Sequence, residues 1–224
     1  MTLNNKIKQA FTQSDIKNQN LILAVSGGSD SQVLLKAVPH IAKQFGVKCF
    51  AVGINHGLRP EADQELDLAE KLAISNHIPF IRVKVKVSDG ASLQAQARDA
   101  RYTALMEQAD IYHAKYITTA HHFDDRAETV LIRLIRGKHI GSLGVLPAIS
   151  GRIFRPMLKV TKQEIFSYCK RWKLHYASDP SNENTHYLRV KIRKEILPIF
   201  EQLNPQFKQR LNDLADEILN GKFN

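Results

Sequence analysis

The chain has 224 residues, of which 43% are hydrophobic and 24% charged, and it carries only two cysteines. This fits one soluble α/β domain with at most a small appendage. No apolar run approaches a membrane span, and the polar first 16 residues lack the apolar stretch of a secretory signal, so we expect a cytoplasmic protein without membrane contact. Cys49 and Cys169 lie far apart and form neither a CxxC pair nor a metal-ligand spacing.

The net charge of +10 is concentrated in one part of the chain. Residues 133–173 hold ten Lys or Arg side chains against a single acid, Glu164, which gives +9. Such a block favours a polyanionic partner such as nucleic acid, since phosphate contacts release counterions. A solvated basic face without a partner is the alternative, and charge alone leaves both open.

Apolar runs alternate with segments of helical spacing four times in the first 136 residues. The predicted strands are residues 21–25, 47–54, 80–87 and 116–120, and the predicted helices are residues 30–45, 61–77, 92–108 and 125–136. This alternation is typical of a doubly wound parallel sheet with right-handed crossovers.

The pattern changes after Gly137, where glycine, proline and basic residues dominate as far as Pro156. Further helices are predicted over residues 161–171, 187–200 and 205–219. Thr161 and Glu164 have the spacing of a capping box at the start of the first of these. We expect an α/β domain over residues 1–150 and a basic, mostly helical portion over residues 151–224.

The loop after the first predicted strand is the most informative segment. Its glycines allow the backbone to turn tightly and approach a ligand, and the start of the next helix favours an anion. Asp30 would repel phosphate unless a cation such as Mg²⁺ lies between them. A Gly-Gly turn followed by a capped helix is the alternative. The loop consists of Ser26, Gly27, Gly28, Ser29, Asp30 and Ser31, and it lacks the lysine of a Walker A sequence.

This loop resembles the SGGxDS loop of the N-type ATP pyrophosphatases, also called PP-loop enzymes. Further motifs resemble the tRNA(Ile)-lysidine synthetase family of that group, over about residues 21–198. The motifs are NHGLRP at 55–60, ARDARY at 97–102, HHFDDRAET at 121–129, RLIRG at 133–137, RP at 155–156 and SDPSN at 178–182.

The resemblance implies a fold and a reaction. The fold is adenine nucleotide α-hydrolase-like, with residues 1–150 as the ATP-binding domain. The reaction uses ATP and Mg²⁺ to adenylate the wobble cytidine of tRNA(Ile), and lysine then displaces AMP to form lysidine. tRNA and lysine are the implied partners, and a homodimer stays open.

The resemblance and the position after the fourth strand also imply site residues. The expected catalytic residues are Asp30, Asp124, Asp125 and His121, and Asp30 is also the expected metal ligand. Asp125 alternatively caps a helix together with Glu128. Trp172 and Tyr176 could stack on a base, but Trp172 is rather expected in the core. The expected substrate-binding residues are His56, Arg59, Arg98, Arg101, His122, Glu128, Arg133, Arg136, Arg189 and Arg193.

The chain departs from the family pattern at Arg126, His139, Ser142 and Val190, in segments that the family uses for the second substrate and the tRNA. Adenylation is therefore better supported than lysine as the nucleophile. A minimal enzyme, a fragment and a paralogue with another substrate all stay open. Sulfur transfer is disfavoured by the cysteines, and a small-molecule amide ligase by the basic block. The intact loop argues against a non-catalytic nucleotide- or RNA-binding module, but the four substitutions keep that alternative open.

Overall fold

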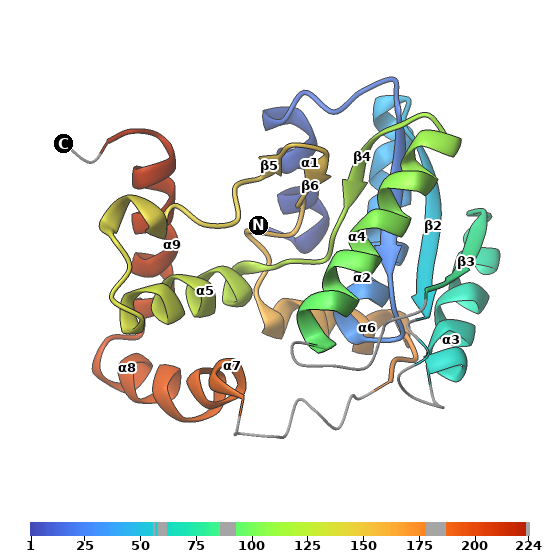
Figure 1. The fold of residues 1–224 in the computed structure, drawn as a ribbon. Coiled ribbons are helices and arrows are strands. Elements are labelled where there is room, and N and C mark those ends of the chain that lie inside the picture. The colour runs from blue at the N-terminus through green and yellow to red at the C-terminus, as the bar shows by residue number, and fades with distance from the viewer. Residues whose placement is uncertain (56, 58–61, 86–92, 178–186, 223–224) are drawn as a thin grey trace.

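The computed structural model describes residues 1–55, 57, 62–85, 93–177 and 187–222 (Figure 1). The SDPSN motif, His56, Arg59 and the ends of some predicted elements lie outside this part. The strands are β1 (Asn20–Val25), β2 (Lys48–Asn55), β3 (Phe80–Lys84), β4 (Ala114–Thr118), β5 (Ile149–Ser150) and β6 (Ile153–Phe154). The helices are α1 (Leu3–Gln13), α2 (Ser29–Ala42), η1 (Lys43–Phe45), α3 (Ala62–Ser75), α4 (Leu93–Ile111), α5 (Phe123–Ile135), η2 (Ile140–Leu143), α6 (Lys162–Trp172), α7 (Leu188–Lys191), the π-helical turn η4 (Ile192–Ile196), α8 (Leu197–Leu203) and α9 (Phe207–Leu219).

The six strands form one sheet in the order β3-β2-β1-β4-β6-β5. All neighbouring strands are parallel except β5, which is antiparallel to β6. The chain moves from β1 to β2 and β3 on one side and then returns to β4 on the other side of β1. This confirms the doubly wound sheet and places its switch point between β1 and β4, where such sheets bind ligands.

Helices cover both faces of the sheet (Figure 1). Helices α1, α2, α3 and α6 contribute to one buried cluster, and α4 packs against the opposite face. Because both faces are covered, β1 is buried along nearly its whole length, as its continuous apolar sequence predicts.

The last helices form a separate apolar cluster with α5. Residues of α5, η4, α8 and α9 build this cluster, which lies to the left of the sheet in Figure 1. In contrast, β6 and α6, which also follow residue 150, belong to the sheet part. The division of the chain near residue 150 stays a prediction.

The structure contains elements that the sequence pattern did not indicate. Helix α1 buries Leu3, Ile7 and Phe11 along one side, although the segment is polar overall. Strands β5 and β6 have two residues each, too few for any periodicity to show.

The predicted capping box of α6 is present. Thr161 Oγ1 accepts a hydrogen bond from Glu164 N at 3.2 Å, and Glu164 Oε2 accepts one from Thr161 N at 2.8 Å. Glu164 Oε2 also accepts a hydrogen bond from Lys6 Nζ at 2.7 Å, which ties α6 to α1. The cap therefore fixes the first turn of α6 and its position on the sheet at the same time.

Replacing Glu164 by Gln should cost stability in a pH-dependent way. Burial raises the pKa of Glu164, but the hydrogen bonds and charge of Lys6 and Thr161 lower it below its ordinary 4.5. The charged form is therefore stabilising above that value, and this contribution is lost as the pH falls through the lowered pKa. Denaturant unfolding at neutral and acidic pH should show a stability difference between Glu164→Gln and wild type that shrinks in acid. A difference independent of pH would contradict this role.

Candidate active site

The loop of residues 26–31 joins β1 to α2 at the carboxyl edge of the sheet. A Cβ atom on Gly27 would lie 2.7 Å from the backbone oxygen of Glu65, so α3 leaves room only for glycine there. Gly28 is the N-cap of α2, and Ser26 Oγ lies 3.0 Å from Ser31 Oγ. The first N–H groups of α2 lack intrahelical acceptors, so the loop has the features of an anion site.

The amino ends of two more helices meet this loop. Phe123 N at the start of α5 donates to Val160 O at 2.9 Å, and Lys162 N at the start of α6 donates to Asp124 Oδ2 at 2.8 Å. The Lys162 side chain continues to the loop, where Nζ lies 2.5 Å from Asp30 Oδ1 and 3.0 Å from Ser29 Oγ. The sequence-predicted Asp30 and Asp124 are thereby brought together.

His122 is the buried centre of the acidic residues. Its Nε2 lies 3.7 Å from Asp30 Oδ2 and 3.4 Å from Asp125 Oδ2, and its Nδ1 lies 3.7 Å from Asp124 Oδ2. Burial lowers the pKa of His122, but the three carboxylates raise it more. Conversely, burial raises the pKa of Asp30, while His122 and Lys162 lower it to about 2. Asp30 is thus anionic at neutral pH, and carboxylates of three aspartates surround one imidazole.

Asp124 is already bound on both oxygens. Oδ2 accepts from Lys162 N, and Oδ1 accepts from Lys208 Nζ of α9 at 2.9 Å. Burial raises its pKa, but these donors lower it below the ordinary value. Asp124 therefore links α5, α6 and α9 and holds these three helices together at the site.

Glu128 is fully buried and holds two arginines. Its carboxylate accepts hydrogen bonds from Arg189 Nε at 2.7 Å and from Arg193 Nε at 2.6 Å. Both guanidinium groups remain roughly two-fifths exposed and also approach Asp125 Oδ1, at 3.4 and 3.8 Å. Glu128 thus positions two half-exposed cations beside Asp125 and has no exposed surface of its own.

Asp125 helps to cap α5, but its partner is the N-cap residue His122, and not Glu128 as its spacing had suggested. Helix α5 begins two residues earlier, at Phe123, so Asp125 stands in the first turn. There its Oδ2 accepts a hydrogen bond from His122 N at 3.1 Å. The alternative of an Asp125–Glu128 capping box is therefore wrong, because Glu128 points to the arginines.

His121 lies among charged groups of both signs at the site. His121 Nδ1 is 2.8 Å from Thr119 Oγ1, and burial, against the opposing charge of Asp125, lowers the pKa of His121 to about 4. Arg155, Arg189 and Arg101 act in the same direction as burial. His121 is therefore neutral at physiological pH. Arg98 is exposed, with its guanidinium 5.3 Å from the ring centre of Tyr102.

Other predicted residues lie away from this centre. Arg133 donates to the carbonyl oxygen of Ser142, and Arg136 is the exposed C-cap of α5. Trp172 is 46% exposed, so its expected place in the core is wrong. It is the last residue of α6, while Ile165 and Cys169 provide the buried side of that helix.

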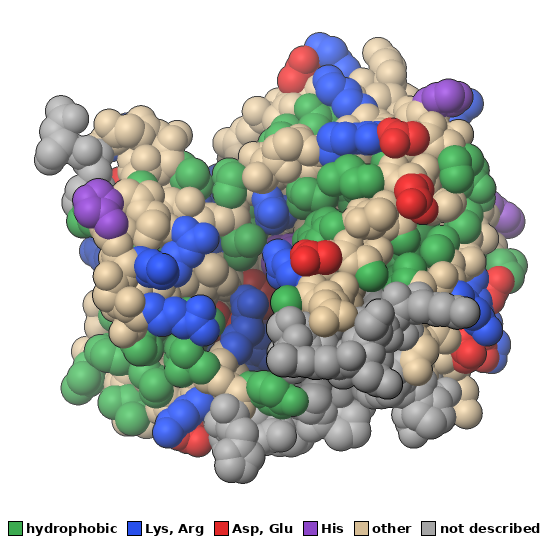
Figure 2. All heavy atoms as spheres, in the orientation of Figure 1, with side chains coloured by type: hydrophobic (Ala, Val, Ile, Leu, Met, Phe, Trp, Pro, Cys, Tyr) green, Lys and Arg blue, Asp and Glu red, His purple; other side chains and the backbone are tan. Residues whose placement is uncertain are grey.

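The basic block is also less free than its sequence suggests. Arg152 pairs with Asp110, Lys162 pairs with Asp30, and Arg155 is buried. In Figure 2, Lys, Arg, Asp and Glu side chains gather in the hollow between the α5–α9 part and the sheet part. Part of the positive charge therefore serves internal pairs.

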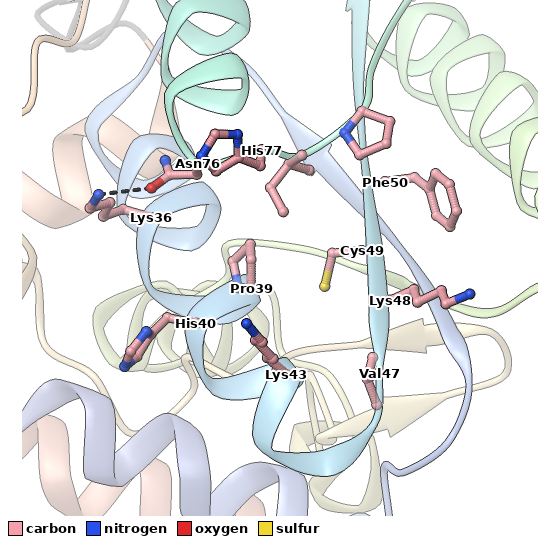
Figure 3. A pocket seen from close by; sticks show the side chains of 12 residues that line it. Lys36, Pro39, His40, Lys43, Val47, Lys48, Cys49, Phe50, Asn76 and His77 are labelled. Carbon is pink, nitrogen blue, oxygen red and sulfur yellow. Dashed lines mark hydrogen bonds between the residues drawn. The ribbon is translucent and has the colours of Figure 1, made fainter.

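The pocket in Figure 3 lies elsewhere, near the amino end of β2. It has a volume of about 600 Å³ and is lined by residues of α2, β2 and the segment between α3 and β3. None of the sequence-predicted site residues lines it. We therefore place the candidate site by its chemistry, at the carboxyl edge.

The PP-loop domain family matches residues 1–200 of the chain. The chain belongs to the PP-loop family. It is 39% identical to a tRNA(Ile)-lysidine synthase of Haemophilus ducreyi over 210 residues. This alignment covers 92% of this chain and 48% of that protein. It is 34% identical to the tRNA(Ile)-lysidine synthase of Petrotoga mobilis, over 90% of this chain and 67% of that protein. The lysidine synthase branch indicated by the motifs is thereby confirmed.

The chain spans about half the length of most of the curated tRNA(Ile)-lysidine synthases that it matches. Among solved structures, the U34-tRNA thiolase NcsA from Methanococcus maripaludis has a TM-score of 0.81 at 18% identity, covering 97% of this chain and 78% of that one. The NH3-dependent NAD synthetase from Campylobacter jejuni has a TM-score of 0.54 at 15% identity, covering 97% and 93%. These likenesses show the PP-loop fold.

Use of ATP follows from membership of this family, whereas the metal needs a test against the residues present. The described residues contain no group of three His, Cys, Asp or Glu side chains ready to hold a metal ion. Mg²⁺ in nucleotide sites takes one or two carboxylates and completes its shell with phosphates and water. Asp30, one-third exposed in the anion loop, fits that partial role. No helix in the described part is long and apolar enough to cross a membrane.

The family departures have structural explanations. Arg126 is buried, with Nε donating to Val145 O at 3.1 Å and Nη2 donating to Asp216 Oδ1 at 2.7 Å. His139 caps η2, and Val190 is buried. Arg126 therefore connects α5 to α9.

Replacing Arg126 by Gln should lower stability without changing nucleotide binding. The shorter side chain leaves a buried carbonyl oxygen without its charged donor, which costs about 1–3 kcal/mol. Denaturant unfolding and ATP-analogue binding measure the two effects. The exposed Arg210→Gln on α9 is the matched control, with an expected change within about 0.5 kcal/mol. Weakened analogue binding in the folded Arg126→Gln variant would show that Arg126 acts on the site.

Proposed function

We propose that the chain is the catalytic part of an ATP-dependent tRNA-modifying ligase that converts the wobble cytidine of tRNA(Ile) to lysidine. The C2 oxygen of the cytosine attacks the α-phosphorus of ATP, and pyrophosphate leaves. The lysine ε-amine then attacks C2, the bond from C2 to that oxygen breaks, and AMP leaves with the oxygen while the amine loses a proton. The relatives' names support this reaction.

One geometric observation carries the proposal. Asp30 of the anion loop and Asp125 of the HHFDDRAET motif both reach the Nε2 atom of His122. The predicted nucleotide residue and the predicted amine-binding residue therefore belong to one site. A two-step reaction in which ATP activates the C2 oxygen and the amine then attacks C2 of the same base requires such proximity.

Asp125 is the acid best suited to hold an incoming ammonium group. Glu128 is fully buried and Asp124 is bound on both oxygens, so neither has a free oxygen to offer. Asp125 is partly exposed, and its nearest cations lie at 3.4 Å or more. A lysine side chain would add a closer, charge-assisted contact there.

The half-exposed Arg189 and Arg193 suit the opposite charge. Their guanidinium groups are fixed by Glu128 and present their remaining N–H groups toward the site. We assign them to phosphate, either of ATP or of the RNA strand, because guanidinium binds phosphate oxygens in pairs. Asp30 would hold Mg²⁺, which neutralises charge on the polyphosphate.

Sulfur transfer, the reaction named for the thiolase of similar fold, is not favoured by the cysteines. Cys49 lies in β2 and Cys169 in α6, and both are buried. Burial raises the pKa of Cys49 to about 12 and that of Cys169 to about 11. Neither thiol therefore forms the reactive thiolate that persulfide chemistry requires.

Replacing Asp125 by Asn tests the proposal. Asn keeps the shape and still accepts the hydrogen bond from His122 N, but it loses the charge that would hold an ammonium group. Transfer of labelled lysine to tRNA(Ile) should fall on the order of 100-fold, because one strong electrostatic contact is lost in a sheltered site. Release of pyrophosphate should fall less, since adenylation precedes the amine.

The control for this experiment is Asp213→Asn, an acid of α9 that accepts a hydrogen bond from Gln209 Nε2 at 2.7 Å. Melting of each variant is measured on the same preparation as its activity. Unchanged lysine transfer in a folded Asp125→Asn protein would contradict the role of Asp125. Absence of transfer in the wild type, with AMP and pyrophosphate still formed, would contradict lysine as the second substrate.

A further inference from the structure

An ammonium group lies where the loop of residues 26–31 is expected to bind phosphate. Lys162 Nζ contacts Asp30 Oδ1 and Ser29 Oγ, although Lys162 and Asp30 are 132 residues apart in the sequence. The loop itself carries no lysine, unlike a Walker A loop, in which lysine reaches the terminal phosphates. The structure brings a lysine to the same kind of loop from a different helix.

The position of Lys162 is fixed by several independent contacts. Its backbone N–H is bound by Asp124 Oδ2 at 2.8 Å, and the capping box of Thr161 and Glu164 shapes the first turn of α6 around it. Nζ also lies 4.9 Å from the ring centre of Phe166. The side chain is therefore directed into the loop by its own helix start and by α5.

The ion pair with Asp30 is easily broken. Both side chains are about one-third exposed, and exposed ion pairs contribute little to stability. A triphosphate with its metal offers each partner a stronger contact, because the metal attracts the carboxylate and the phosphate attracts the ammonium. The exchange leaves no charge unpaired in the site.

We propose that Lys162 is the phosphate-binding lysine of this site, and that Asp30 holds it in the loop until nucleotide arrives. The inference rests on the proposed use of ATP at this loop, and it adds a catalytic residue that contacts the polyphosphate. Before nucleotide binds, Lys162 and a metal ion compete for Asp30, because Lys162 occupies the oxygen that the metal ion would take. Loss of Lys162 therefore has opposite effects on two ligands.

The test measures two equilibrium affinities on Lys162→Met and Lys162→Gln. The first ligand is α,β-methylene-ATP with Mg²⁺, which is not cleaved between the α and β phosphates. Its affinity should fall about 10-fold to 100-fold, as expected for one charge-assisted hydrogen bond. The second ligand is Mn²⁺ alone, followed by electron paramagnetic resonance. Its affinity should rise several-fold, because Asp30 is freed from its cation.

Lys162→Arg keeps the charge and should bind the analogue better than either neutral variant. Lys159→Gln, an exposed lysine just before α6, is the matched control and should change neither affinity. Melting curves show which variants are folded. Two neutral variants are used, so that the test can still be carried out with one of them if the other does not fold.

Unchanged analogue affinity in a folded neutral variant would overturn the proposal, as would a parallel fall of both affinities, which indicates a structural role. The assay contains no RNA and no lysine. It therefore remains decisive if the enzyme transfers a different nucleophile, and failure of the proposed function is seen separately in the labelled-lysine assay.

Discussion

The site depends on the meeting of three helix amino ends at the switch point of the sheet. Helices α2, α5 and α6 begin at Ser29, Phe123 and Lys162, beside the carboxyl ends of β1 and β4. Each start presents backbone N–H groups without intrahelical acceptors, together with the positive end of a helix dipole. Such a point attracts negative charge, and the chain places Asp30, Asp124 and Asp125 there.

The negative charge is balanced by side chains from distant parts of the chain. Lys162 and Lys208 pair with Asp30 and Asp124, while Arg189 and Arg193 pair with Glu128. These cations come from α6, α7, η4 and α9, so the site is complete only when the later helices pack against α5. Stability and function therefore share the same ion pairs, whereas the cations nearest to Asp125 Oδ1 lie at 3.4 and 3.8 Å.

The strongly periodic elements could be predicted from the sequence. Strand β1 and its loop followed from an apolar run and two glycines, and the capping box of α6 from Thr161 and Glu164. The bounds of β4 were wrong by two residues at each end, since Ala114 and Lys115 continue the strand without adding to the apolar pattern. Short strands and the amphipathic α1 were missed because neither gives a strong local signal.

The candidate site was predicted only where a motif is local. The pairing of Glu128 with Arg189 and Arg193, and the contact of Lys162 with Asp30, join segments more than sixty residues apart. No spacing in the sequence reports such contacts. The exposure of Trp172 was likewise decided by which side of α6 faces the sheet.

The family departure at Arg126 shows how tertiary contacts change the interpretation of a motif. By sequence it lies within the acidic motif and weakens the assignment of lysine as substrate. In the structure its guanidinium donates to Val145 O and to Asp216 Oδ1, neither of which belongs to the acids of the site. The departure therefore concerns how α9 is attached and leaves the proposed chemistry intact.

The central claim is that the site adenylates an oxygen of the RNA base, which the amine then displaces. The most direct test uses tRNA(Ile) with ¹⁸O at the C2 oxygen of the wobble cytidine, together with ATP, Mg²⁺ and lysine. Mass spectrometry of the released AMP should show one ¹⁸O atom per lysidine formed, because that oxygen leaves with the phosphate. AMP without the label, in a reaction that still forms the modified base, would contradict the account.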